Sequence, residues 1–316
     1  MTTVAPEFEV IVRGRTAVAE RVVRVDLERT DGEPFPGWRP GAHLDLVLPI
    51  GVERQYSLCG DPADRDVWTI GVLREEHSRG GSDWVHDVLE VGGSIRVRGP
   101  WNHFAMTDAA SYRFVAGGIG ITPLLPMIRA AEASGASWTL DYAGGSTSRM
   151  AFASELAALG GERVRLHVAD EGRRLDLAAL TPQAGELVYA CGPARMIDEL
   201  TSLSTGWPPS TLHVERFEAK PLAEPVLHES FEVELLLSGE TLTVPPERTV
   251  LDVVEEAGLF VLSSCREGTC GTCETVVVEG QVDHRDSILS PEEQRANDRM
   301  MICVSRAACP RLVLEL

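Results

Sequence analysis

The chain has 316 residues, 44% of them hydrophobic and 24% charged, and it carries a formal net charge of −19. This length predicts two or three domains. The acidic charge argues against nucleic acid and anionic membrane surfaces as partners, although it also serves ordinary solubility. The sequence has no run of about 18 apolar residues and no secretory signal at its start, so we expect a cytoplasmic protein without a membrane span.

Residues 1–107 alternate apolar and polar positions over several short runs, among them FEVIVRGR, HLDLVLP, VWTIGVLRE and SIRVRGP. Clusters of Gly, Pro and Asp separate these runs, and one helical segment, SDWVHDVLE, interrupts them. Many short strands at this spacing predict a closed or nearly closed antiparallel β-barrel. We therefore expect a first domain over residues 1–107.

After residue 107 the pattern changes to strands that alternate with helices. YRFVAGG, WTLDYAGG, VRLHVAD, ELVYACG and TLHVERF read as strands, whereas TPLLPMIRAAEAS, AFASELAAL and ARMIDELTSL have helical length and periodicity. Alternation of this kind predicts a parallel sheet with helices on both faces. We expect this α/β nucleotide-binding domain over residues 108–222.

A linker with several chain breaks, AKPLAEPVLHES, leads to the last segment, residues 226–316. FEVELLLSGETLTV predicts a hairpin, RTVLDVVEEAG a helix and TVVVEGQV a further strand, which together indicate a small α+β domain. The segment holds 7 Arg and no Lys against 17 Asp and Glu, so its net charge is −10. More than half of the net charge of the chain therefore lies in its last third.

Four of the seven cysteines follow a recognisable spacing. Cys265, Cys270 and Cys273 form C-x4-C-x2-C in SSCREGTCGTCE, and Cys303 follows at a distance. This is the plant-type spacing for a [2Fe–2S] cluster, which needs four thiolates. A zinc site is the alternative, but the second C-x2-C knuckle that it usually has is missing. Cys309 has no place in the spacing, and we expect it to be a buried structural thiol.

Two strings in the first domain indicate a flavin. In RQYS, a predicted barrel strand presents Arg54, Tyr56 and Ser57. The serine hydroxyl or backbone N–H can bond to a flavin nitrogen, and the arginine can pair with a phosphate. The string GGS, residues 80–82, precedes the predicted helix, where a serine N-cap and free N–H groups form an anion site. Taken singly, each string has an ordinary alternative: an exposed strand that carries an arginine, or a helix cap without a ligand.

Two strings in the second domain place glycines where strands run into helices. VAGGIGITP carries Gly117, Gly118 and Gly120, and Pro123 suits the first helical turn that follows. These glycines allow a pyrophosphate to approach the backbone at a helix N-terminus. CGP, residues 191–193, ends another predicted strand, and ligands bind at such strand ends in parallel sheets. A tight turn without a ligand is the alternative for each string.

Taken in order, RQYS, GGS, GGIGITP, CGP and CREGTCGTC with a distant fourth cysteine resemble the phthalate dioxygenase reductase family, which includes vanillate demethylase reductases. The resemblance covers essentially the whole chain. It implies an FMN-binding barrel, a nicotinamide-binding α/β domain and a C-terminal plant-type ferredoxin domain with a [2Fe–2S] cluster. FMN is favoured over FAD because the loop between Arg74 and Gly80 is short and offers no platform for an adenosine.

The resemblance also assigns site residues. Those expected to contact FMN or the nicotinamide nucleotide are Arg54, Gln55, Tyr56, Ser57, Gly71, Val72, Leu73, Gly80, Gly81, Ser82, Gly118, Gly120, Thr122, Cys191, Gly192, Pro193 and Phe217. Four of these are expected to act as catalytic residues: Ser57, Thr122, Cys191 and Phe217, the last of which covers the flavin. The expected cluster ligands are Cys265, Cys270, Cys273 and Cys303.

The implied reaction is hydride transfer from NADH to FMN, followed by transfer of single electrons through the [2Fe–2S] cluster to a terminal oxygenase. The oxygenase is either a Rieske non-haem enzyme or a haem monooxygenase. NADPH is the alternative nucleotide, because Ser146, Ser148 and Arg149 offer a 2′-phosphate site, whereas Asp141 favours NADH. One chain that holds every redox centre predicts a monomer. The competing hypothesis is a zinc-stabilised binding protein with a degenerate flavoprotein fold.

Overall fold

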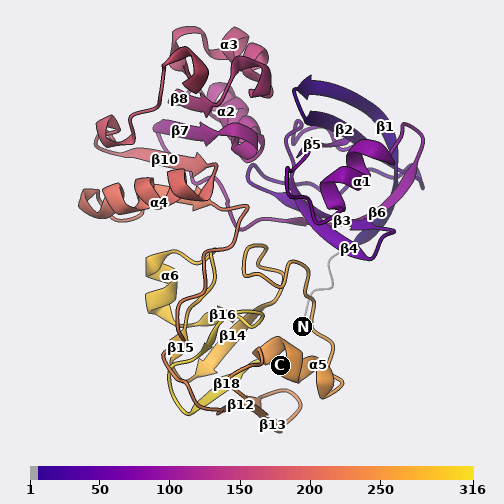
Figure 1. Cartoon of the computed structure of the whole chain (residues 1–316), viewed down its shortest axis with the longest axis vertical. Helices are drawn as coiled ribbons and strands as arrows, with labels where there is room; N and C mark the ends of the chain where they lie inside the picture. The colour runs from indigo at the N-terminus through magenta and orange to yellow at the C-terminus, as the bar shows by residue number, and fades with distance from the viewer. Residues whose placement is uncertain (1–5) are drawn as a thin grey trace. The chain divides into compact units, whose positions relative to one another are not determined.

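A computed structural model describes residues 6–316, which divide into two compact units after Phe217 (Figure 1). Unit 1 contains the expected barrel and the expected α/β domain, and unit 2 contains the cysteine motif. The domain limits at residues 107, 222 and 226 stay predictions. Among the helices of residues 6–316, none is long and apolar enough to cross a bilayer.

The first sheet of unit 1 is antiparallel, with the strand order β4-β3-β6-β1-β2-β5. A bridge between Leu58 and Ile70 joins its two edges, so the sheet closes into the predicted barrel. Alternate side chains, such as Val10, Val12 and Val25, fill the barrel core. The elements are β1 (Glu7–Ala19), β2 (Val22–Arg29), β3 (His43–Leu48), β4 (Val52–Ser57), β5 (Trp68–Leu73), α1 (Gly81–Asp87) and β6 (Ser94–Trp101).

Helix α1 begins earlier than the sequence predicts. Gly80 is its N-cap and takes a φ of 90°, in the left-handed region that glycine adopts at the lowest cost. Ser82 therefore lies inside the first turn, and the expectation that it caps the helix was wrong. Its hydroxyl oxygen accepts instead from the N–H of Glu75 at 3.2 Å, which ties the loop before α1 to the helix.

The second sheet of unit 1 is parallel, as predicted, with the order β11-β10-β7-β8-β9. Phe114 and Tyr142 pack with α2 and α3 on one face, whereas Val115 and Val188 pack with α4 on the other. Strand β7 lies in the middle of the sheet: β8 and β9 extend the sheet on one side of it, and β10 and β11 extend it on the other. Ligands bind at such a switch point. The elements are β7 (Ser111–Gly117), η1 (Gly118–Gly120), α2 (Ile121–Ser134), β8 (Ser137–Gly144), α3 (Ala153–Gly160), β9 (Val164–Val168), β10 (Glu186–Cys191), α4 (Ala194–Leu203) and β11 (Leu212–Glu215).

Helix α2 joins the two sheets of unit 1. Its Arg129 donates through Nη1 to the carbonyl oxygens of Cys59 and Gly60, at 3.1 and 3.2 Å, just beyond the end of β4. The same guanidinium pairs with Glu155 of α3. One side chain thus connects the barrel strand that carries RQYS to two helices of the α/β sheet.

Unit 2 has a mixed sheet in the order β13-β12-β18-β14-β16 and a separate pair, β15–β17. The predicted hairpin and helix are present, and α5 begins at a capping box in which Thr249 and Asp252 bond to each other's backbone N–H groups. Phe231, Val233 and Leu314 lie in its core. The elements are β12 (Phe231–Leu235), β13 (Glu240–Val244), α5 (Val250–Glu256), β14 (Glu274–Glu279), β15 (Val282–Asp283), α6 (Pro291–Ala296), β16 (Arg299–Met301), β17 (Arg306–Ala307) and β18 (Arg311–Leu314).

Candidate functional site

The four cysteines of the spacing motif meet in unit 2. Cys265, Cys270 and Cys273 lie on the loop between α5 and β14, and Cys303 follows β16. Strands β14 and β16 pair, and the N–H of Ile302 donates to the carbonyl oxygen of Cys273 at 3.5 Å, which brings the distant cysteine to the loop. Cys265 is partly exposed, whereas the other three side chains are buried. The fold therefore assembles the set that the spacing predicts.

Backbone N–H groups of the loop point at a sulfur. The N–H groups of Glu267 and Thr269 each donate to Sγ of Cys265 at 3.4 Å. Hydrogen bonds with Cys270 and then Cys303 lower the pKa of the Cys265 thiol, with further help from Thr269 and Glu267. Donors of this kind offset the negative charge of a thiolate. The loop is thus suited to hold a metal-bound sulfur.

Residues with positive φ shape the same loop. Gly268 has a φ of 71°, and a Cβ there would lie 2.6 Å from Cγ2 of Val304. Gly271 has a φ of 75°. Arg266 also takes a left-handed conformation, with a φ of 56°, and its guanidinium binds Glu255 of α5 at 2.6 Å. Two glycines and an anchored arginine therefore fix a backbone path that few other residues would follow.

The sulfurs form a row of neighbours. Cys265 is in hydrogen-bonding contact with Cys270 and Cys303, and Cys303 contacts Cys273 as well. In the described part of the chain, no group of three or more His, Cys, Asp or Glu is arranged to hold a single metal ion. Four thiols in a row can instead give two ligands to each of two irons, which is the donor set of a [2Fe–2S] cluster.

Cys309 differs from the expectation in its burial. Its side chain is partly exposed, because it lies in the turn that leads into β18. Its Sγ accepts from the N–H of Gln281 at 3.1 Å and donates to the carbonyl oxygen of Arg311 at 3.0 Å. The thiol is structural in the sense that it bonds to two backbone groups, but it is not buried.

The two flavin strings lie together in unit 1. A Cβ on Gly81 would lie only 2.7 Å from Cγ of Arg54, so the arginine side chain passes directly over the first turn of α1. Its Nη2 also donates to the carbonyl oxygen of Arg79 at 3.4 Å. Gln55 bonds through Nε2 to Asp45 at 2.8 Å, beside the barrel. The guanidinium and the N–H groups of the α1 turn thus form one cationic corner, as a phosphate requires.

The end of the RQYS strand meets the α/β sheet at a carboxyl group. The hydroxyl of Ser57 hydrogen-bonds to Glu215 at the end of β11, and Sγ of Cys191 donates to Oε2 of the same residue at 3.9 Å. Burial raises the pKa of Glu215 to about 8, although both hydrogen bonds lower it. Burial also raises the pKa of the Cys191 thiol well above its ordinary value, and that of Tyr56 to about 12. These groups are therefore largely uncharged at neutral pH.

Glu215 is a site residue that sequence reasoning missed. The available signal was an acidic residue inside the short predicted strand TLHVERF, two positions before Phe217. That signal is weak because acidic residues often lie on the exposed face of a strand. Only the meeting of β4, β10 and β11 shows that this carboxyl group lies between two predicted catalytic side chains.

The two glycine turns touch each other through their backbones. A Cβ on Gly120 would lie 2.3 Å from the carbonyl oxygen of Cys191, and a Cβ on Gly192 would lie 2.9 Å from Cα of Gly117. Pro193 caps α4 immediately afterwards. The turns after β7 and β10 therefore form one continuous wall at the switch point of the sheet, where side chains would block the approach.

The barrel reaches this wall through β5. A Cβ on Gly71 would lie 2.8 Å from Cγ2 of Thr122, which is buried and donates through its hydroxyl to the carbonyl oxygen of Ile119 at 2.9 Å. Val72 points the other way, into the barrel core, so only its backbone is available to a ligand. Phe217, which follows β11, leaves 44% of its side chain exposed, as a ring that covers a bound flavin would need.

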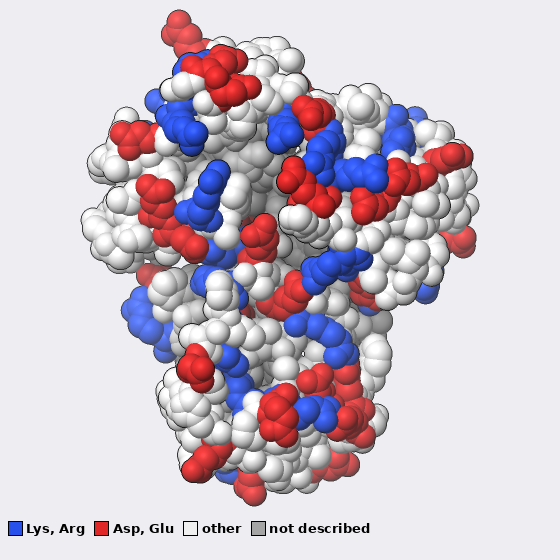
Figure 2. All heavy atoms as spheres, in the orientation of Figure 1, with Lys and Arg blue, Asp and Glu red and all other residues white. Residues whose placement is uncertain are grey.

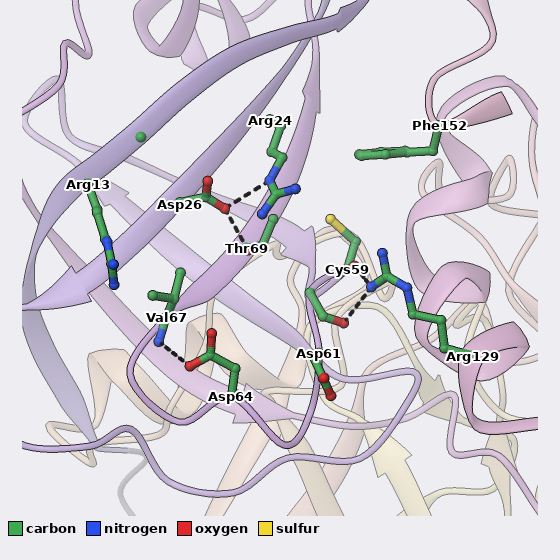
Figure 3. A pocket seen from close by; sticks show the side chains of 12 residues that line it. Arg13, Arg24, Asp26, Cys59, Asp61, Asp64, Val67, Thr69, Arg129 and Phe152 are labelled. Atoms are coloured by element: carbon green, nitrogen blue, oxygen red, sulfur yellow. Dashed lines mark hydrogen bonds and ion pairs between the residues drawn. The ribbon is translucent and has the colours of Figure 1, made fainter. Parts of the chain in front are cut away.

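A separate cavity of about 540 Å³ lies beside α2 and contains none of the predicted flavin residues. Figure 3 shows Arg24, Asp26 and Thr69 bonded to one another along its wall, with Arg129 on the opposite side. Asp26 accepts from the arginine Nε at 3.0 Å and from the threonine hydroxyl at 2.7 Å. Because these groups satisfy each other, the cavity does not compete with the switch point as the cofactor site.

Comparison with known proteins agrees with this geometry. Residues 233–308 match the 2Fe-2S iron-sulfur cluster binding domain family. A putative toluene-4-sulfonate monooxygenase system reductase subunit from Comamonas testosteroni is 42% identical over 98% of this chain and 99% of its own. The crystal structure of phthalate dioxygenase reductase, described as modular for electron transfer from pyridine nucleotides to [2Fe-2S], is 34% identical, with a TM-score of 0.69 over 98% of both chains.

A second solved structure, an intact type IV self-sufficient cytochrome P450 monooxygenase, is 43% identical with a TM-score of 0.93. It covers 98% of this chain, but this chain spans only 41% of that one. The fold of the present chain thus recurs as one part of a longer polypeptide.

A flavin barrel, a nucleotide-binding sheet and a four-cysteine loop on one chain define an iron–sulfur flavoprotein oxidoreductase. The expected fold, the oxidoreductase class and the cofactors FMN, a pyridine nucleotide and [2Fe–2S] are confirmed by the full-length matches. The choice of NADH over NADPH stays a prediction. The chain belongs to the phthalate dioxygenase reductase family, the reductase components of oxygenase systems. This assignment replaces the competing hypothesis of a zinc-stabilised binding protein.

Proposed function

We propose that this chain passes electrons from NADH, through FMN in unit 1 and a [2Fe–2S] cluster in unit 2, to a terminal oxygenase. The observation that carries the proposal is the match along essentially the whole chain to a reductase subunit of a monooxygenase system. The match to a self-sufficient P450 supports a haem monooxygenase as acceptor, and the match to phthalate dioxygenase reductase supports a dioxygenase. A Rieske oxygenase and a haem monooxygenase therefore both remain candidate partners.

The flavin residues divide their roles by position. When bound, FMN takes up a hydride and releases single electrons, and the [2Fe–2S] cluster carries one electron at a time. Arg54 and the N–H groups of Gly81 and Ser82 hold the phosphate in this proposal, because they form the cationic corner. Tyr56 and Gly71 border the ring from the barrel side.

The nicotinamide side uses the neutral groups at the strand ends. Gly118, Gly120 and Gly192 let the nucleotide approach the backbone. Thr122 and Cys191 line the place where the nicotinamide stacks. Ser57 and Glu215 hydrogen-bond to each other, and together they place a polar, uncharged pair beside Cys191. Phe217, which is 44% exposed, would cover the flavin ring when no nucleotide is bound. These roles are proposals that substitution of each residue can test.

Unit 2 presents the cluster to the acceptor. Phe260 is 80% exposed and lies on the loop that leads to Cys265, the most exposed of the four ligands. Unit 2 has more carboxylates than arginines, and at least four of its arginines already pair with carboxylates within the unit. The unpaired carboxylates are therefore available to a basic partner. The paired arginines are Arg248, Arg266, Arg299 and Arg311. On the visible face, acidic and basic side chains are interspersed (Figure 2). We propose an oxygenase with a basic docking surface around an apolar contact.

The remaining parts of the proposal concern the state of the protein in the cell. We place the chain in the cytoplasm, where thiolate ligands stay reduced until a cluster is built. We take it to work as a monomer, because one chain supplies every redox group, and its net charge of −19 opposes binding to nucleic acid.

The test uses the holo-protein, NADH and two acceptors. Ferricyanide accepts electrons directly from flavins, whereas mitochondrial cytochrome c is a basic one-electron acceptor that resembles the proposed partner surface. We expect cytochrome c reduction to fall severalfold as salt rises from about 50 to about 500 mM, because the Debye length shortens from roughly 14 to 4 Å over that range. Ferricyanide reduction should stay nearly constant. Equal salt profiles for the two acceptors would contradict docking by the acidic unit.

A further inference from the structure

Asp141, the buried acidic residue of β8, is not available to bind the ribose of the nucleotide. Asp141 lies within the strand and is 2% exposed. Its two carboxylate oxygens accept from Arg165 Nη2 at 2.7 Å and pair with His167 Nε2 at 2.9 Å, both on β9. The carboxylate that was expected to favour NADH is therefore occupied inside the sheet. Selection between NADH and NADPH must rest on other residues.

The loop after β8 is bound instead by a residue of the barrel. Glu20, in the turn between β1 and β2, accepts through Oε2 from the hydroxyl of Ser148 at 3.1 Å. Its Oε1 lies 3.6 Å from Nη2 of Arg149. The hydroxyl of Ser146 is 3.0 Å from that of Ser148. The three side chains that could bind a 2′-phosphate, Ser146, Ser148 and Arg149, thus gather around one carboxylate.

The position of this carboxylate is fixed by the backbone. The N–H of Glu20 donates to the carbonyl oxygen of Ser148 at 2.7 Å. The next residue, Arg21, takes a φ of 64°, so the turn is tight. Since the main chain of the turn is bonded to the loop, the carboxylate stays beside it even when its side-chain contacts change.

A second carboxylate closes the other side of the loop. The hydroxyl of Thr147 donates to Oε1 of Glu171 at 3.0 Å. The hydroxyls of Thr147 and Ser148 therefore each bond to a carboxylate, and the hydroxyl of Ser146 bonds to that of Ser148. An incoming phosphate would meet two acidic groups at a site where its natural donors are engaged.

We propose that Glu20 makes this enzyme select NADH and reject NADPH, by placing a carboxylate where the 2′-phosphate of NADPH would have to bind. The inference rests on the proposed function, in which the nucleotide lies across the carboxyl ends of β7 and β8. Ligands bind outside the carboxyl ends of the strands in such sheets, and the loop that Glu20 contacts follows the carboxyl end of β8. A hydroxyl can donate to the carboxylate, whereas a phosphate carries like charge into direct contact with it.

The direct test is Glu20→Gln in the full-length holo-protein. Glutamine keeps the size and the hydrogen-bonding oxygen but removes the charge. We expect kcat/KM for NADPH, measured by ferricyanide reduction, to rise about tenfold or more, and that for NADH to change by less than about threefold. Because Glu20 and Arg149 are both about half-exposed, their ion pair contributes little to folding, and the variant should remain folded.

Two further variants separate selection from other roles. Glu20→Gln combined with Arg149→Ala should lose most of the gain with NADPH, because the arginine released by the first change is the group that would bind the phosphate. Glu28→Gln is the matched control, since Glu28 is also a partly exposed barrel carboxylate that faces an arginine. This variant should leave kcat/KM unchanged for both NADH and NADPH.

The outcomes distinguish this inference from the proposed function. The inference is overturned if Glu20→Gln changes kcat/KM for NADPH by less than about twofold, or if it raises kcat/KM for NADH and NADPH equally. It is also overturned if the wild-type enzyme has the same kcat/KM for NADPH as for NADH. If neither nucleotide reduces the flavin of the wild-type enzyme, the proposed function itself fails.

Discussion

The two units distribute their functional residues differently along the chain. In unit 2, three of the four cluster ligands lie in one loop, Cys265–Cys273, and only Cys303 comes from elsewhere. In unit 1, the site residues come from β4, β5, the start of α1, the turns after β7 and β10, and the end of β11. A local site can lose its cofactor while its neighbour keeps working, whereas a site built from many elements depends on how two sheets pack.

The units also treat charge differently. The cysteine loop directs N–H groups at a sulfur, so that a thiolate is stabilised in place. At the strand ends of unit 1, burial raises the pKa of the partly exposed Glu215 to about 8, so that charge is suppressed. A cluster held in the cysteine loop would sit among negative thiolate ligands, whereas a flavin and nicotinamide bound in unit 1 would lie among neutral groups. This contrast indicates which substitutions should affect only one unit.

The largest effect is expected from Cys303→Ala, which removes the single distant ligand. Three thiolates cannot complete the ligand set, so we expect the protein to lose its iron and the cluster absorption. Cytochrome c reduction should fall at least a hundredfold, about 2.7 kcal/mol or more in activation free energy, while NADH still bleaches the flavin at near wild-type rate. Iron analysis measures the loss of the cluster, and stopped-flow absorption measures the rate of flavin reduction by NADH.

The matched control is Cys309→Ala, which removes a thiol of the same unit that bonds only to backbone groups. It should retain iron and cytochrome c reduction. Loss of flavin reduction in the Cys303 variant would show that the two units do not work independently.

The sequence predicted the fold because its signals were periodic and local. Alternation in β1 to β6 indicated the barrel, and the strand–helix repeat indicated the parallel sheet, down to the bounds of α4 at Ala194–Leu203. The error at α1 arose because two glycines stand side by side before Ser82. The residue that takes the left-handed conformation decides where the helix starts, and the string GGS does not show which glycine that is.

Site prediction was limited by long-range contacts. The cluster ligands were predictable because their spacing is a property of one loop. Glu215 and Glu20 were not, because each acts on residues far away in sequence, Ser57 in one case and Ser148 in the other. The prediction that Asp141 binds the nucleotide was wrong, because its carboxylate bonds to Arg165 and His167 of β9, which the sequence alone does not bring next to it.

The composite nature of the unit 1 site can be tested at Gly120. In Gly120→Ala, the new Cβ would lie 2.3 Å from the carbonyl oxygen of Cys191, so the turns after β7 and β10 must separate. We expect a destabilisation of about 1–3 kcal/mol and a lowering of the Tm by roughly 5 °C. The KM for NADH should rise severalfold, while the iron content stays unchanged.

Gly206→Ala provides the comparison, because a Cβ there meets nothing within 4 Å. It should leave both the Tm and the KM for NADH close to the wild-type values. A Gly120→Ala protein with an unchanged KM would show that the contact between the two turns does not shape the nucleotide site.

The smallest effect, and the most specific, is expected from Glu215→Gln. The pKa of about 8 in the folded protein lies above the ordinary value of 4.5, so the folded state binds this proton more tightly. The resulting stability is complete below about pH 4.5 and is lost as the pH rises through about 8. The Tm of the wild-type protein should therefore fall more steeply between about pH 5 and 8 than that of the glutamine variant.

Activity should respond in the same direction. Ionisation of Glu215 puts a negative charge next to Ser57, where a reduced flavin also gathers negative charge, so flavin reduction by NADH should slow as the pH rises through about 8. In Glu215→Gln this inflection should disappear, with a rate at neutral pH within about tenfold of wild type, because glutamine keeps a neutral polar group in place. Glu199→Gln, on the exposed face of α4, should keep the wild-type profile. An inflection that persists in Glu215→Gln would assign the titration to another group and remove Glu215 from the neutral cluster that distinguishes unit 1 from unit 2.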